Sequence, residues 1–131
     1  MKKILIISIV SMMTVSALCQ SNPLWLRYTA ISPDGKTILF TYKGDIYSVP
    51  SEGGTAVPLT ISESYEFSPR WSRNGRSIAF ASDRYGNFDV FVMPSSGGEG
   101  KRLTFYSGNE LPCSFTSDNN AVLFSAYRQD L

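Results

Sequence analysis

Acidic side chains are the residues of this chain that could hold a metal ion or transfer protons. Asp34 and Asp118 stand in turn-forming runs, Asp45 and Asp89 open predicted strands, and Asp83 ends another. They recur at equivalent places of a repeat, and side chains of this type hydrogen-bond the backbone of their own turn. The chain contains no Asp-x-Asp-x-Asp-Gly run of the kind found in calcium loops. We therefore expect structural carboxylates, with no metal site and no cofactor site.

A nucleophile is the second kind of chemistry to consider, and Ser82-Asp83-Arg84 is the run that suggests one. A catalytic serine needs a base within hydrogen-bond reach, whereas neighbouring residues of a strand point to opposite faces. The chain contains no histidine, which excludes a histidine-based triad, a histidine general base and histidine metal ligands. The glycine-rich residues 97–100 lack the Gly-Lys-Ser/Thr ending of a phosphate-binding loop and predict a hairpin turn. We expect no catalytic or cofactor-binding residue in this chain.

Three aromatic residues near predicted loops are candidates for binding rather than catalysis. Tyr85, Phe88 and Tyr106 could line a surface for extended peptides, although packing at the edges of the sheets is the favoured interpretation. Cys113 lies in a predicted strand and is expected to be a small, buried, apolar residue. A net charge of +1 gives no electrostatic reason to expect nucleic acid as a partner.

Internal repetition determines the predicted fold. Residues 31–40 (ISPDGKTILF) align with residues 71–80 (WSRNGRSIAF), and the pattern returns at residues 115–124 (FTSDNNAVLF). Residues 45–50 (DIYSVP) align with residues 89–94 (DVFVMP), and a Gly-Gly pair and a Leu-Thr pair follow both. The repeat length is therefore about 40–45 residues, as in β-propellers.

Each repeat predicts four short antiparallel strands. A first strand ends at an aromatic or β-branched residue, a tight turn follows, and the second strand carries apolar residues on both faces, which indicates burial on both sides. The third strand ends at a proline, which cannot continue a ladder, and the Gly-Gly pair turns the chain into a short outer strand. We predict an all-β fold, a truncated β-propeller of four-stranded antiparallel blades, with about two and a half blades present.

The predicted domains are a signal peptide at residues 1–19 and a partial propeller at residues 20–131. Blade one is expected at about residues 24–62, blade two at about 66–106, and an incomplete blade three at 110–131. Propellers have about 4–8 blades, so at least half of the ring is expected to be missing.

The N-terminus has the pattern of a secretory signal peptide. Lys2 and Lys3 precede an apolar run at residues 4–18, and small residues before Gln20 suit cleavage between Cys19 and Gln20. A spanning helix needs about 20 apolar residues, which disfavours stable membrane insertion. A lipid on Cys19 is the other alternative, and Leu18 fits that kind of cleavage poorly. We expect an exported protein, periplasmic or extracellular, and only Cys113 remains after cleavage, so no intrachain disulfide is expected.

The repeats resemble those of the TolB and tricorn propellers. The resemblance rests on residues 31–36 (ISPDGK), 45–47 (DIY) and 78–84 (IAFASDR). Residues 22–28 (NPLWLRY) and 83–90 (DRYGNFDV) are more specifically similar to bacterial tricorn protease homologues. Two turns depart from the usual repeat without changing its turn chemistry. Blade two has Arg73-Asn74 in place of Pro-Asp, and blade three has the turn SDNN.

This resemblance implies that the chain is the N-terminal part of an exported tricorn-like serine peptidase. Its propeller would gate or guide peptides or unfolded polypeptides toward a catalytic domain encoded downstream, and the full protein would be a hydrolase. Oligomerisation of the full protein stays open. One alternative is a non-catalytic TolB-like interaction propeller, although TolB itself has an α/β domain before its propeller and residues 20–24 leave no room for one. Another is the propeller of a different hydrolase, related to prolyl oligopeptidases or amidohydrolases.

Overall fold

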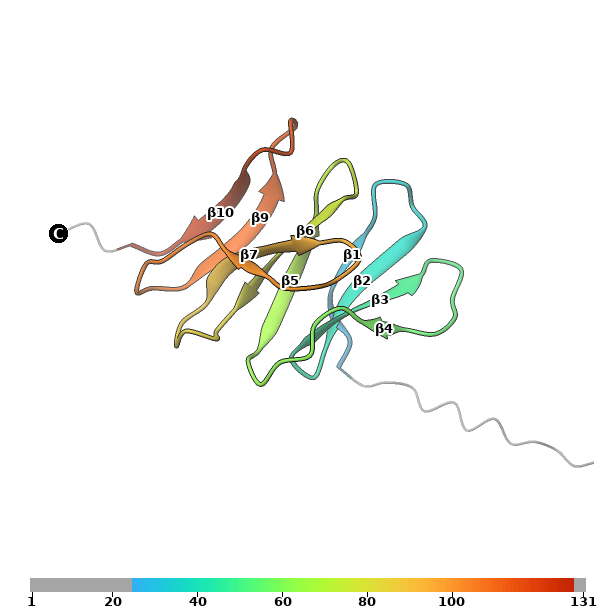
Figure 1. Cartoon of the computed structure of the whole chain (residues 1–131), viewed down its shortest axis with the longest axis horizontal. Helices are drawn as coiled ribbons and strands as arrows, with labels where there is room; N and C mark the ends of the chain where they lie inside the picture. The colour runs from blue at the N-terminus through green and yellow to red at the C-terminus, as the bar shows by residue number, and fades with distance from the viewer. Residues whose placement is uncertain (1–24, 129–131) are drawn as a thin grey trace, which may run out of the picture.

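The computed structural model describes residues 25–128, which form ten β-strands in three antiparallel sheets (Figure 1). The first sheet, blade one, has the order β1 (Arg27–Ile31), β2 (Thr37–Tyr42), β3 (Asp45–Pro50) and β4 (Val57–Pro58). Blade two has the order β5 (Glu66–Trp71), β6 (Ser77–Ser82), β7 (Asp89–Pro94) and β8 (Lys101–Arg102). Blade three contains β9 (Glu110–Phe115) and β10 (Val122–Ala126). The predicted all-β propeller architecture is confirmed.

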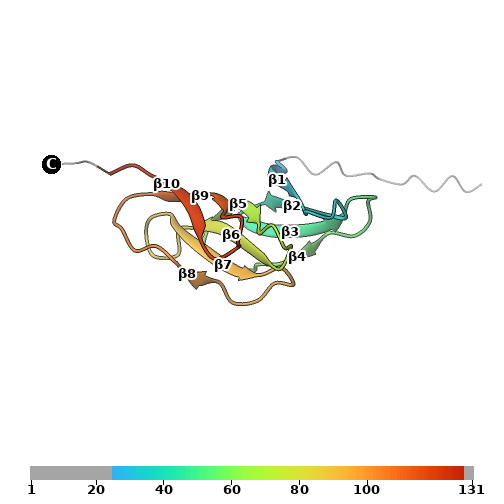
Figure 2. The same ribbon diagram turned by 90° about the horizontal axis from the view of Figure 1, so that it is seen from above.

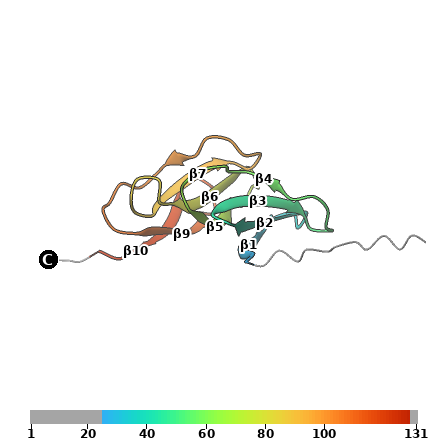
Figure 3. The same cartoon turned by 90° about the horizontal axis from the view of Figure 1, so that it is seen from below.

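The three sheets stand side by side as a fan. In Figures 2 and 3 the first strands β1, β5 and β9 follow one margin of the fan, and the outer strands β4 and β8 lie toward the opposite margin. Strand β5 contacts β1, β2 and β3 of blade one, while β9 contacts β5, β6 and β7 of blade two. Blades therefore meet face to face, as expected for neighbouring blades of a propeller.

The antiparallel order gives each blade two distinct ends. We call "turn end" the end that carries the hairpins after first and third strands, at residues 32–36, 51–56, 72–76, 95–100 and 116–121. The opposite "linker end" carries the hairpins after second strands and the linkers between blades, at residues 43–44, 59–65, 83–88 and 103–109.

The main hydrophobic core lies between blades one and two. Leu39 and Ile46 of blade one cluster with blade-two residues whose side chains are almost completely buried, namely Ile78, Phe80, Phe91 and Met93. Burying each of these side chains contributes about 1.5–3 kcal/mol. Strand β6 is buried on both faces, as predicted from its apolar residues.

The prediction of burial on both faces fails for β10. Leu123 and Phe124 are exposed there, because blade three has only its first two strands in the described residues. The predicted signal peptide, including Cys19, lies outside the described residues. Within residues 25–128 no helix is long and apolar enough to cross a membrane.

Candidate functional site

The turn-end carboxylates form hydrogen bonds within their own turns. Asp34 Oδ1 accepts hydrogen bonds from the Ser32 hydroxyl at 2.6 Å and from the Lys36 amide at 3.1 Å. The Ser32 hydroxyl in turn accepts a bond from the Thr37 amide at 2.9 Å. The hydroxyl of Ser32 and the amide of Lys36 lower the pKa of Asp34. The predicted structural role of this carboxylate is confirmed.

The same hydrogen bonds recur in the turns of blades two and three. Asn74 Oδ1 accepts bonds from the Ser72 hydroxyl at 2.8 Å and the Arg76 amide at 3.0 Å. Asp118 Oδ1 accepts bonds from the Thr116 hydroxyl at 2.5 Å and the Asn120 amide at 3.1 Å, and the Thr116 hydroxyl is the main cause of its lowered pKa. An amide thus replaces a carboxylate in blade two without altering the turn, which argues against a chemical role for the charge.

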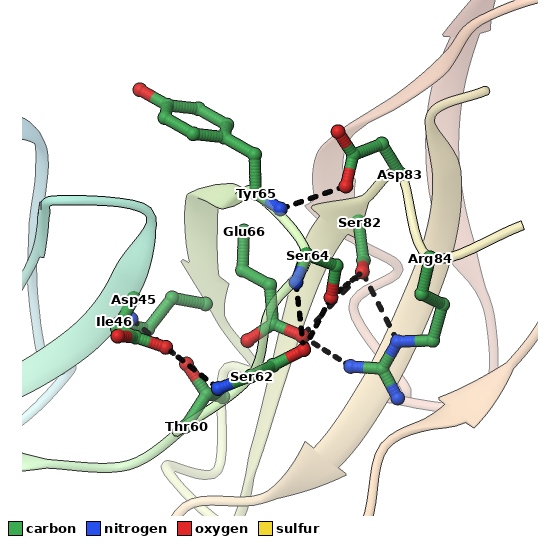
Figure 4. A network of polar contacts seen from close by, with 10 residues as sticks. All are labelled: Asp45, Ile46, Thr60, Ser62, Ser64, Tyr65, Glu66, Ser82, Asp83 and Arg84. Carbon is green, nitrogen blue, oxygen red and sulfur yellow. Dashed lines mark hydrogen bonds and ion pairs between the residues drawn. The ribbon is translucent and has the colours of Figure 1, made fainter. Parts of the chain in front are cut away.

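The run Ser82-Asp83-Arg84 belongs to a polar network at the linker end (Figure 4). Arg84 Nη2 forms an ion pair with Glu66 Oε1, and Arg84 Nε donates to the Ser82 hydroxyl at 3.1 Å. Ser82 and Glu66 are both fully buried. The serine hydroxyl is therefore inaccessible to a substrate, and the nearby carboxylate is already engaged by a guanidinium group.

Asp83 closes the linker that leads into blade two. Its Oδ1 accepts a hydrogen bond from the Tyr65 amide at 2.7 Å (Figure 4). Next to it, the Glu66 amide donates to the Gly44 carbonyl of blade one at 2.7 Å. Asp45 acts in the same way, since its Oδ1 accepts a bond from the Ser62 amide at 3.1 Å. These carboxylates therefore hold the connection between blades, and the prediction that they bond the backbone of their own turns is wrong for Asp45 and Asp83.

Sequence reasoning missed the buried ion pairs at the starts of blades two and three. Glu110 Oε1 pairs with Arg128 Nη2 at 2.8 Å, which repeats the Glu66–Arg84 pair 44 residues later. Burial acts to raise the pKa of Glu110, but the hydrogen bonds from Arg128 and Thr104 outweigh it and the pKa is lowered. The recurrence of Glu and Arg at this one spacing was the signal available in the sequence.

A third buried carboxylate anchors an arginine among aromatic rings. Asp89, which is fully buried, pairs with Arg102 at 2.7 Å. The guanidinium carbon of Arg102 lies 4.4 Å from the ring centre of Tyr85 and 4.7 Å from that of Phe105. Tyr85 stacks on Phe91 at 6.2 Å between ring centres. Phe91, Tyr85 and the Arg102 guanidinium group therefore form a stack that extends from the core to the linker-end surface.

Large exposed hydrophobic side chains gather at the linker end of the blades. We call "linker-end aromatic surface" the set of Tyr65, Tyr85, Phe105 and Tyr106, to which Ile61 is adjacent in the first linker. Tyr85 is 61% exposed and Phe105 is 72% exposed. The turn-end hairpins, in contrast, contain no large hydrophobic residue at all. The two ends of this propeller segment thus offer different chemistry.

The predicted packing role holds for Phe88, while Tyr85 and Tyr106 make packing contacts and also remain exposed to solvent. Phe88 packs edge-on against Phe67, with ring centres 4.8 Å apart. Tyr85 and Tyr106 are exposed, and Arg128 covers the ring of Tyr106 at 4.8 Å.

The buried placement predicted for Cys113 is wrong, because Cys113 is exposed at an irregularity of β9 where it has no partner on β10. No group of three metal-ligating side chains occurs within residues 25–128.

Comparison with known proteins places this geometry in a family. The model of the tricorn protease N-terminal beta propeller domain matches residues 23–131. The chain belongs to this family. Tricorn protease homolog 1 of Streptomyces coelicolor is 32% identical over 108 residues, which are 82% of this chain and 10% of that protein. Dipeptidyl-peptidase 5 of Porphyromonas gingivalis is 32% identical over 106 residues, which are 73% of this chain and 16% of that protein.

The tricorn-type propeller is also similar to a TolB structure. A TolB-type protein from Agrobacterium tumefaciens superimposes with a TM-score of 0.72 at 27% identity, over 85% of this chain and 42% of that one. The segment therefore shares its blade architecture with both kinds of propeller named by the sequence resemblance.

Proposed function

We propose that this tricorn-type propeller segment is the N-terminal part of an exported serine peptidase, and that it guides extended peptides toward the catalytic domain. The observation that carries the proposal is the linker-end aromatic surface within a family named after a protease. Aromatic faces and arginine guanidinium groups contact a wide range of side chains, so they suit a guide that must accept many sequences. The buried ion pairs below that surface hold its loops in place.

The guide is best tested by separating long substrates from short ones. In the complete protein that contains this chain, Tyr85→Ala and Phe105→Ala each remove exposed rings. We expect kcat/KM to fall about three- to tenfold for an unfolded protein substrate, since each ring contributes of the order of 1 kcal/mol to contact. Hydrolysis of a short chromogenic peptide, which does not need guiding, should be unchanged.

The matched control is Arg76→Ala, which removes an exposed side chain at the turn end. It should leave both activities as they are. Equal loss on long and short substrates, or no loss on either, would contradict the guiding role. Complete absence of peptidase activity in the native protein would instead refute the enzyme assignment.

A second candidate is a non-catalytic interaction propeller of the TolB kind, favoured by the match to the TolB-type structure. A third is the propeller of another peptidase, favoured by the similarity to dipeptidyl-peptidase 5. Labelling of the complete protein with a fluorophosphonate distinguishes the non-catalytic TolB-like propeller from the two kinds of peptidase, because only an activated serine reacts. Cleavage specificity then separates a tricorn-like enzyme from a dipeptidyl peptidase.

Export is the remaining part of the proposal. It rests on the charged start and apolar run of residues 1–19. Mass spectrometry of the mature protein should find an N-terminus at Gln20. An N-terminal Cys19 carrying a lipid would show membrane anchoring instead, and an intact Met1 would refute cleavage.

A further inference from the structure

The turn end contains a polar cavity between blades one and two that the guiding role does not use. Its volume is about 690 Å³, which lies in the range of small-molecule sites. Both blades that form it are complete four-stranded sheets. Its lining residues with side-chain hydroxyls are Ser32, Thr37, Ser48, Ser95 and Ser96. Trp71, Asp34, Arg73 and Asn74 also line the cavity.

Most of these polar groups have unused hydrogen-bonding capacity. Within residues 25–128 the hydroxyls of Thr37, Ser48, Ser95 and Ser96 make no side-chain hydrogen bond. Asp34 uses Oδ1 for its turn and leaves Oδ2 for another partner. A hydroxyl both donates and accepts, so the cavity presents both functions close together.

Trp71 supplies a rigid aromatic wall. Its Nε1 donates a hydrogen bond to the Ala30 carbonyl at 3.2 Å, which fixes the orientation of the indole ring. The ring also packs against the core between the blades. A fixed aromatic face beside hydroxyl groups matches a ligand that has a C–H face and a rim of hydroxyls.

The repeat itself shows that the fold does not require this polarity. Val92 occupies the position in blade two that Ser48 occupies in blade one, and Phe115 takes the place of Trp71. The equivalent space between blades two and three is smaller, about 170 Å³, and Val92 and Phe115 line it. The fold therefore accepts an apolar side chain at the Ser48 position and does not require a hydroxyl there.

The charges of the lining residues favour a neutral ligand. Asp34 and Arg73 balance each other, and no second cation lines the cavity to hold a phosphate group. From this balance, the hydroxyls and the indole wall, we propose that the cavity binds a neutral saccharide unit of a glycan, with its ring against Trp71. The bound sugar would thus lie at the turn end, opposite the linker-end aromatic surface.

The test titrates chitotriose and cellotriose separately into the complete protein, with binding followed by calorimetry and by ligand-observed NMR. We expect at least one of them to bind. Ser48→Val should weaken that binding about three- to tenfold, the effect of one hydrogen bond, with an unchanged melting temperature. Arg73→Ala should weaken it as well, whereas Arg76→Ala, which removes an exposed arginine outside the cavity, should not.

Two results would overturn the proposal. One is the absence of binding by both glycans at millimolar concentration in a folded protein. The other is binding that Ser48→Val and Arg73→Ala leave unchanged, which would place the sugar elsewhere. Trialanine, titrated in the same way, refines the first result. If it binds in the cavity and the glycans do not, the cavity is a peptide site and the saccharide assignment is wrong. Neither result depends on peptidase activity, so the guiding role is tested independently.

Discussion

Removal of the Arg84 guanidinium group should lower the free energy of unfolding, because it breaks the buried ion pair at the start of blade two. Glu66 is fully buried, and its Oε2 has no hydrogen-bond partner within residues 25–128, so Arg84 is the main compensation for its charge. The Arg84→Met variant keeps the apolar stem of the side chain and removes only the guanidinium group. A buried, uncompensated carboxylate is then left between β5 and β6.

The expected cost follows from the burial of each partner. Loss of one member of a buried pair costs about 3–5 kcal/mol. The Arg84 side chain is 28% exposed, so part of its charge is already solvated and the lower end, about 3 kcal/mol, applies. The Arg128 side chain is 53% exposed, and Arg128→Met should therefore cost less, of the order of 1–2 kcal/mol.

Urea unfolding of the propeller in the complete protein, followed by tryptophan fluorescence, measures these differences. Trp71 reports on folding because it packs against the core between the blades. The Glu66→Gln/Arg84→Met double variant removes both charges and should recover at least half of the loss. A loss below about 1 kcal/mol in Arg84→Met, or no recovery in the double variant, would refute this account of the pair.

Three further outcomes follow from the structure. Gly100→Ala should destabilise the propeller by about 1–3 kcal/mol in the same unfolding assay, because the added Cβ would lie 2.8 Å from Cζ of the buried Phe80 ring. Asp34→Asn should flatten the loss of stability on acidification below about pH 4, since the lowered pKa of Asp34 gives stability that is present above its unfolded value and lost as pH falls through the folded one. The isolated mature segment should unfold broadly or aggregate in calorimetry, because Leu123 and Phe124 of β10 are exposed, and a sharp monomeric transition would contradict this.

The repeat made the blade architecture predictable, because it records both local turn chemistry and burial. Each turn has a hydroxyl residue at its start, an Asp or Asn two residues later, and a Gly or Asn after that. In all three blades the hydroxyl donates a hydrogen bond to the Asp or Asn side chain. Gly35, Gly75 and Asn119 all have positive φ, as those turns require. Short-range rules of this kind act within a few residues and can be read without knowledge of the fold.

Contacts between distant strands were not predictable in the same way. The Glu66–Arg84 pair joins residues 18 apart across a register that only the folded sheet defines. Cys113 is exposed although it lies in a strand, at an irregularity of β9 that its small, apolar side chain does not reveal. The exposure of Tyr85 likewise depends on how the longer hairpin at residues 83–88 stacks on Phe91.

Agreement and disagreement between repeats therefore carry different information in this propeller. Where blades agree, as in the turn hydroxyls and the Glu–Arg pairs, the side chains bond within their own blade, to the backbone in the turns and to each other in the ion pairs. Where equivalent positions differ although the fold would accept the same side chain, folding does not explain the choice of residue. Ser48 of blade one and Val92 of blade two are such a pair. Two of the disagreements lie at the turn-end cavity and in the longer hairpin that carries Tyr85. Those two places, at opposite ends of the blades, are consequently where this segment can differ in function from other propellers built on the same repeat.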